Sequence, residues 1–75
     1  MEMIINTYPV ERPGFNYDFQ GNIDAFANSD ATVMTIVVPK NARAKVKARW
    51  KSAIERSRRN YVVETVDVGV QVRRR

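Results

Sequence analysis

The pattern of hydrophobic and polar positions predicts three strands in the first half of the chain. Residues 1–10 are mostly apolar and include Pro9, which predicts a short strand at the edge of a sheet. Residues 15–20 alternate aromatic and polar side chains, which predicts a second strand with one aromatic face. Residues 31–38 are apolar at nearly every position. They predict a central strand that ends at Pro39, because proline has no backbone N–H.

The spacing changes to a helical one in residues 40–60. This interval is rich in Ala, Lys, Arg and Glu and contains neither Gly nor Pro. Asn41 is the predicted N-cap and Asn60 the predicted stop. The apolar positions form one stripe along the predicted helix, made of Ala42, Val46, Trp50, Ala53, Ile54 and Ser57.

The remaining segments are a strand and an ambiguous stretch. Residues 61–73 predict one long strand, in which Gly69 marks a bulge. Residues 22–30 fit either one or two turns of helix through Phe26, with Asn22 as N-cap and Asn28 as the stop, or a loop.

These elements predict a small single α+β domain over residues 1–75, in the order β-β-β-α-β. One sheet carries one long basic amphipathic helix on a face. A strand, a helix and a strand in direct succession predict a right-handed crossover that joins two parallel strands. The expected core places Trp50 at its centre. Val46 and Ile54 of the helix flank it and pack against Ile36 and Val38 of the central strand.

Composition excludes several kinds of chemistry. The chain has 75 residues, no Cys and no His, so disulfides, Cys or His metal sites and Ser-His-Asp catalysis are excluded. Asp18, Asp24 and Asp30 are six residues apart, which matches no calcium loop. Glu64 and Asp67 fall on opposite faces of the predicted strand and do not form an acid–base pair. We expect no catalytic residue, no metal and no cofactor, and therefore no enzyme.

Charge is distributed unevenly along the chain. Residues 1–38 contain one arginine and five carboxylates, whereas residues 39–75 contain twelve cations and three carboxylates. Such a field favours a polyanionic partner. The sequence shows no secretory signal pattern and no apolar run long enough to cross a bilayer, so a cytoplasmic location is the expectation.

Most of this positive charge falls on the predicted helix. At about 100° per residue, cations form two rows on either side of the apolar stripe. The first basic row is Lys45, Arg49 and Arg56, and the second basic row is Lys47, Lys51 and Arg58. On the side opposite the apolar stripe, a crest of the small residues Ala44, Ala48 and Ser52 separates the two rows, with Arg59 beside it. Cations four apart repel each other, which indicates a binding role beyond solvation.

The leading hypothesis is a non-enzymatic nucleic-acid-binding module that contacts the phosphate backbone, with duplex favoured over single strands. Arg73, Arg74 and Arg75 extend the predicted binding surface, or else form a short disordered tip. The aromatic residues at 15–19 fit a base-stacking surface or the core. We favour the core, because neighbouring aspartates would repel phosphate.

The alternative is a protein-binding module, such as a small phage-like inhibitor or adaptor, whose basic helix docks on an acidic partner surface. A homodimer formed by pairing of the last strand is compatible with either function. Membrane binding through the helix ranks last, because its apolar stripe is modest and better used against a sheet.

Overall fold

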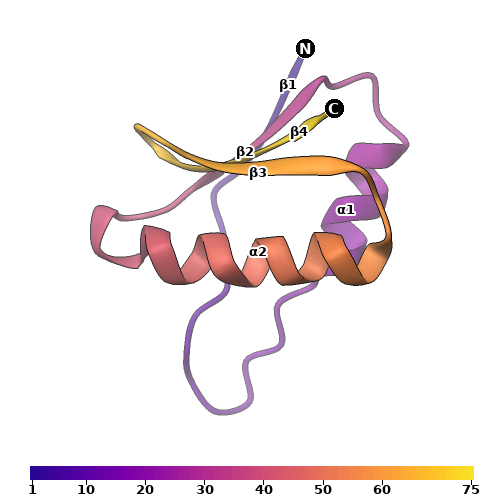
Figure 1. The fold of residues 1–75 in the computed structure, drawn as a ribbon. Helices are drawn as coiled ribbons and strands as arrows, with labels where there is room; N and C mark the ends of the chain where they lie inside the picture. The colour runs from indigo at the N-terminus through magenta and orange to yellow at the C-terminus, as the bar shows by residue number, and fades with distance from the viewer.

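The chain forms one four-stranded sheet with two helices packed on one of its faces (Figure 1). This architecture comes from a computed structural model that describes all 75 residues. The elements are β1 (Glu2–Ile5), α1 (Phe19–Ala27), β2 (Val33–Val37), a 3₁₀ turn η1 (Lys40–Ala42), α2 (Arg43–Ser57), β3 (Tyr61–Val66) and β4 (Gly69–Arg74). The α+β class is confirmed. The order is β-α-β-α-β-β rather than β-β-β-α-β.

The strands lie in the order β1-β2-β4-β3. β1 pairs parallel with β2, whereas β4 is antiparallel to both β2 and β3. β2 and β3 therefore run parallel, as the crossover through α2 requires, but β4 lies between them. Both β-α-β connections step in the same direction across the sheet. A shared right-handed sense then puts α1 and α2 on one face, and the other face stays uncovered.

The prediction of one long strand over residues 61–73 is wrong. The chain turns back at Asp67 and Val68, and Val66 pairs with Gly69 across this two-residue turn. Gly69 begins β4 and is not a bulge. It allows β4 to approach β2 closely, because a Cβ on Gly69 would overlap the carbonyl oxygen of Ile36 and lie 2.6 Å from the backbone nitrogen of Val38.

The predicted aromatic strand at residues 15–20 is also wrong. Residues 6–18 form a loop without regular structure, and α1 begins directly after it. Asp18, not Asn22, caps this helix, because its carboxylate accepts a hydrogen bond of 2.8 Å from the backbone N–H of Gly21. Ile23 and Phe26 of α1 are fully buried. The helical alternative for residues 22–30 is therefore the correct one, although the helix begins earlier.

The helix predicted in residues 40–60 is present as the turn η1 followed by the 15 residues of α2. Its predicted ends are wrong. No side chain caps its N-terminus, so Asn41 is not the N-cap. The helix stops where Arg58 adopts a left-handed conformation with φ 60° and ψ 25°, two residues before Asn60.

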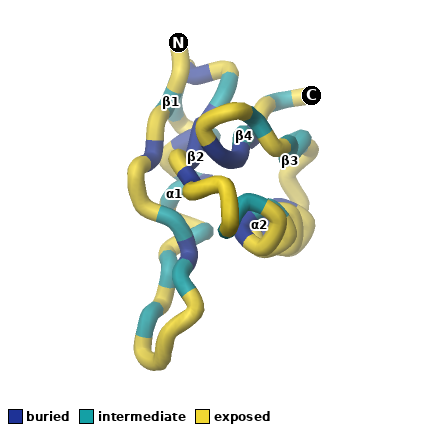
Figure 2. Tube along the Cα trace, turned by 90° about the vertical axis from the view of Figure 1, so that its left-hand side faces the viewer, coloured by how far each residue is buried: buried dark blue, intermediate teal, exposed yellow.

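The predicted core is confirmed. Trp50 is fully buried, and its ring meets those of Phe19 and Tyr17 edge-on, with centroids 5.0 and 5.9 Å apart. The buried positions lie on the central strands β2 and β4, on α1 and along one side of α2 (Figure 2). Besides Trp50, the core contains Ile5, Ile23, Phe26, Ala31, Met34, Ile36, Val38, Val46, Ala53, Ile54, Val70 and Val72.

Candidate polyanion-binding face

The fold fixes which side of α2 faces solvent. Val46, Trp50 and Ile54 point into the core, so the opposite side of the helix is directed outward. Ala44, Ala48 and Ser52 are exposed there and form the narrow crest that the spacing predicts. We call this crest, the two basic rows and Arg59 the α2 face. Its small crest leaves the backbone of the helix open to close approach by a ligand.

The first basic row borders the loop and the start of α1. Arg49 donates a hydrogen bond of 2.6 Å from Nη1 to Oε1 of Glu11, which ties the loop to α2. Lys45 and Arg56 are exposed and form no ion pair. Between Arg49 and Arg56 lies a hollow of about 350 Å³, lined also by Ala48, Ser52 and Phe19. An anion seated there would meet two guanidinium groups and the hydroxyl of Ser52.

The second basic row lies on the other side of α2, toward β3. Lys51 and Arg58 are exposed and form no ion pair, whereas Lys47 is half-buried. Glu64 on β3 has a pKa below its usual value. The main causes are the hydrogen bond and the charge of Arg73, with a smaller contribution from the charge of Lys47. The structure thus places the two rows on opposite flanks of the crest.

Arg59 follows the helix and lies near Asp24 of α1. Its Nη2 is 3.8 Å from Oδ1 of Asp24, at the outer limit of an ion pair, and both side chains are about half exposed. Such a pair at the surface is weak. Arg59 therefore remains open to a stronger anionic ligand.

Two of the three C-terminal arginines are part of the last strand. Arg73 and Arg74 belong to β4, and Arg73 pairs with Glu64 across the hairpin at 2.9 Å. Arg74 turns inward, where its guanidinium stacks on Phe26 and donates to backbone carbonyls near the end of α1. Arg75 alone of the three has no such partner. We therefore leave Arg73 and Arg74 out of the candidate face.

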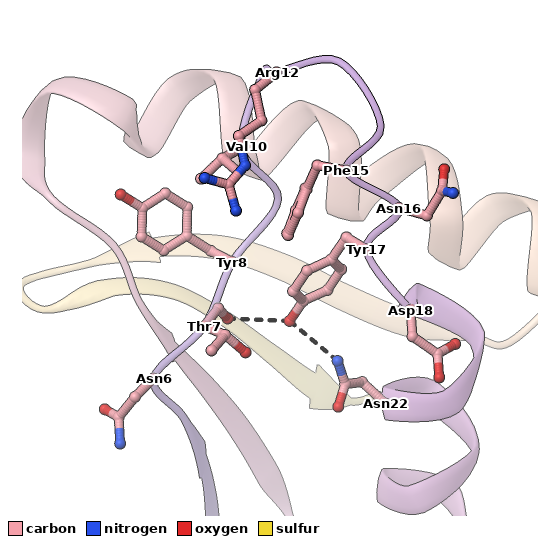
Figure 3. A pocket seen from close by; sticks show the side chains of 10 residues that line it. All are labelled: Asn6, Thr7, Tyr8, Val10, Arg12, Phe15, Asn16, Tyr17, Asp18 and Asn22. Carbon is pink, nitrogen blue, oxygen red and sulfur yellow. Dashed lines mark hydrogen bonds between the residues drawn. The ribbon is translucent and has the colours of Figure 1, made fainter.

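A second feature, which the sequence analysis did not predict, is a hollow of about 540 Å³ in the loop (Figure 3). Its lining comes only from the loop and the start of α1: Asn6, Thr7, Tyr8, Val10, Arg12, Phe15, Asn16, Tyr17, Asp18 and Asn22. The feature of the sequence that could have indicated this hollow is the high density of Asn and aromatic residues between positions 6 and 22. No cation of α2 lines this hollow, so it is separate from the α2 face.

Tyr17 forms the inner wall of the loop hollow. Its hydroxyl donates to the carbonyl oxygen of Thr7 and accepts from Nδ2 of Asn22, both at 3.0 Å (Figure 3). Burial raises the pKa of Tyr17, more than the bond to Thr7 lowers it. Tyr17 and Phe19 pack against Trp50, so these two aromatic residues belong with the core, as expected. Phe15 instead lines the hollow, with the guanidinium of Arg12 5.2 Å from its ring centroid.

Other kinds of site are not supported by the arrangement of side chains. No three carboxylates gather in a way that could hold a metal ion. Neither helix has the length and apolar character needed to cross a membrane.

Comparison of the chain with protein-family models, with curated proteins and with solved structures found no match. The function proposed below therefore rests on the geometry and charge of the chain itself.

Proposed function

We propose that this protein is a non-enzymatic module that binds the phosphate backbone of nucleic acid through the α2 face. The observation that carries the proposal is the outward side of α2. Two rows of cations flank an exposed crest of small residues, and Glu55 is the one carboxylate among them. Phosphates on either side of the crest would each meet one row.

The free-energy balance of the isolated protein supports a role for these cations. Lys45 and Arg49, and likewise Lys47 and Lys51, are four residues apart on the helix, so each pair repels. Glu11 offsets one of these charges. Lys45, Lys51, Arg56 and Arg58 stay exposed and unpaired. A polyanion would relieve this repulsion on binding.

The composition of the crest favours recognition of the backbone over recognition of bases. Bidentate base contacts need Asn, Gln or Arg at the point of closest approach, whereas the crest offers methyl groups and one hydroxyl. Because the crest is narrow and the cations lie to either side, a duplex groove suits the face better than a flat surface does. We also propose a cytoplasmic location, a compartment in which nucleic acid is available as a partner.

The experiment is a mobility-shift titration of duplex DNA with two variants of equal charge change. Lys51→Glu with Arg56→Glu alters one exposed, unpaired residue of each row. Lys40→Glu with Arg12→Glu makes the same change in charge outside the α2 face. We expect the first variant to lose binding by at least about a hundredfold and the second to retain most of it. Equal loss in both would show that net charge, not the α2 face, drives binding.

A further inference from the structure

β3 lies at an edge of the sheet, and no strand covers its outer side. The direction of its free backbone groups follows from the neighbouring strands. The backbone N–H of Val38 donates to the carbonyl oxygen of Val68 at 3.0 Å. The backbone N–H and C=O groups of even-numbered residues between 68 and 74 therefore point toward β2, and those of odd-numbered residues point toward β3. By the register, the N–H and C=O groups of Tyr61, Val63 and Thr65 then point away from the sheet.

This edge lacks the features that usually prevent pairing with another chain. The strand contains no Pro, no Lys and no bulge. Its one charged residue is Glu64, which is engaged by Arg73 of the adjacent strand. The other edge strand, β1, has only four residues. β3 is therefore the more exposed template for an added strand.

The surface beside this edge is cationic. A hollow of about 330 Å³ lies between α2 and β3, with Ile54 and Val63 among its apolar residues. Lys51, Arg59 and Arg75 line the same hollow, against Glu55 as its one carboxylate. A strand added to β3 would lie over this hollow. The positive charge of the three cations therefore favours a strand with acidic side chains.

We propose that β3 binds an extended acidic segment of a partner protein by β-strand addition. Main-chain hydrogen bonds to Tyr61, Val63 and Thr65 would supply the pairing. Side chains of the added strand alternate, so acidic residues would face α2 and β-branched residues would continue the uncovered face beside Val62 and Val66. The inference stands on the edge of the sheet and does not depend on nucleic-acid binding.

A second copy of this chain is a poorer occupant of the same edge. Pairing two β3 strands would place both α2 helices on one side of the joint sheet. The Lys51, Arg59 and Arg75 groups of the two copies would then face each other. Like charges across an interface oppose association. Charge complementarity thus favours the acidic segment.

The test uses fluorescence anisotropy with a labelled peptide in which Glu alternates with Val. Thr65 is exposed, and its N–H points outward. Thr65→Pro removes this donor at an edge position that tolerates proline. Thr65→Val keeps the donor and is the matched control. We expect Thr65→Pro to weaken peptide binding about tenfold or more, Thr65→Val to bind as the unaltered protein does, and both to bind duplex DNA equally.

Two altered peptides test the pairing without changing the protein. One peptide is N-methylated at its Glu residues and the other at its Val residues, and we expect only one of the two to lose binding, because alternate N–H groups of the added strand point toward β3. Replacement of every Glu by Lys should abolish binding. Binding that survives both N-methylated peptides, or that is unchanged in a folded Thr65→Pro variant, would overturn the inference. A dimer seen by sedimentation would also overturn the inference if Thr65→Pro dissociated it and the peptide did not, because a second copy would then occupy the edge.

Discussion

Arg74 donates a hydrogen bond of 2.9 Å from Nη2 to the carbonyl oxygen of Phe26, and its guanidinium lies 4.7 Å from the centroid of the Phe26 ring. The same group donates to the carbonyl oxygens of Ser29 at 3.3 Å and Ala31 at 3.1 Å. The ring of Tyr61 lies 5.8 Å from the guanidinium. One side chain from β4 thus joins the C-terminal end of α1 to β3. The cation also suits the negative end of the helix dipole.

Replacing this arginine should destabilise the fold. We expect Arg74→Ala to lower the free energy of unfolding by about 2–4 kcal/mol, because the carbonyl oxygens near the end of α1 lose their donor and two aromatic rings lose a stacked cation. Denaturant unfolding followed by circular dichroism measures the change. Arg75→Ala is the matched control, and we expect a change within about 0.5 kcal/mol. Equal effects of the two substitutions would contradict the structural role of Arg74.

Gly69 should be the glycine least tolerant of a side chain. A methyl group there would meet the backbone of β2 at Ile36 and Val38, and β4 would have to shift away. We expect Gly69→Ala to cost about 2–4 kcal/mol of stability, which thermal or denaturant unfolding would detect. Gly14 has a positive φ of 78° but open space around it. Gly14→Ala should cost only about 1 kcal/mol. A larger loss of stability in Gly14→Ala than in Gly69→Ala would show that β4 and β2 are not so closely packed.

Tyr17 should make stability fall at alkaline pH. Burial raises its pKa in the folded protein above the ordinary value of 10.0. Its contribution to stability is therefore fully present below pH 10 and is lost as the pH rises from there through the higher pKa of the folded state, because the unfolded chain ionises first. Tyr17→Phe removes this titration. The effect is measured by comparing the free energy of unfolding of the two proteins from neutral to alkaline pH. The unaltered protein should be the more stable at neutral pH, and the difference in free energy between the two proteins should become smaller as the pH rises.

A constant gap between the unaltered protein and Tyr17→Phe across that range would contradict the buried environment of this hydroxyl. At neutral pH we expect the substitution itself to cost about 1 kcal/mol, because the hydroxyl bonds to Thr7 and Asn22 are lost.

The helix and the core follow directly from the sequence, because periodicity over many residues determines them. Trp50, Val46 and Ile54 recur at helical spacing, and the structure buries all three. The same reasoning fails for the hairpin. Valines at every second position from 66 to 72 read as one strand, and the turn at Asp67 and Val68 contains no Gly or Asn to mark it.

The aromatic loop misled the prediction in a different way. Phe15, Tyr17 and Phe19 alternate as in a strand, but Phe19, Ile23 and Phe26 also have helical spacing, with Asp18 as an N-cap. Packing against Trp50 decides in favour of the helix. The role of Arg74 depends on the strand order, because only the central position of β4 brings it near Phe26. Local patterns do not determine strand order.

The most direct test of the α2 face is the salt dependence of duplex binding by the unaltered protein. If Lys45, Lys51, Arg56 and Arg58 contact phosphates, counterion release gives a slope of log affinity against log salt of about −4. Affinity should then fall by about two orders of magnitude between about 50 and 200 mM salt. Absence of binding at about 50 mM salt, or an affinity that does not change with salt, would contradict the account.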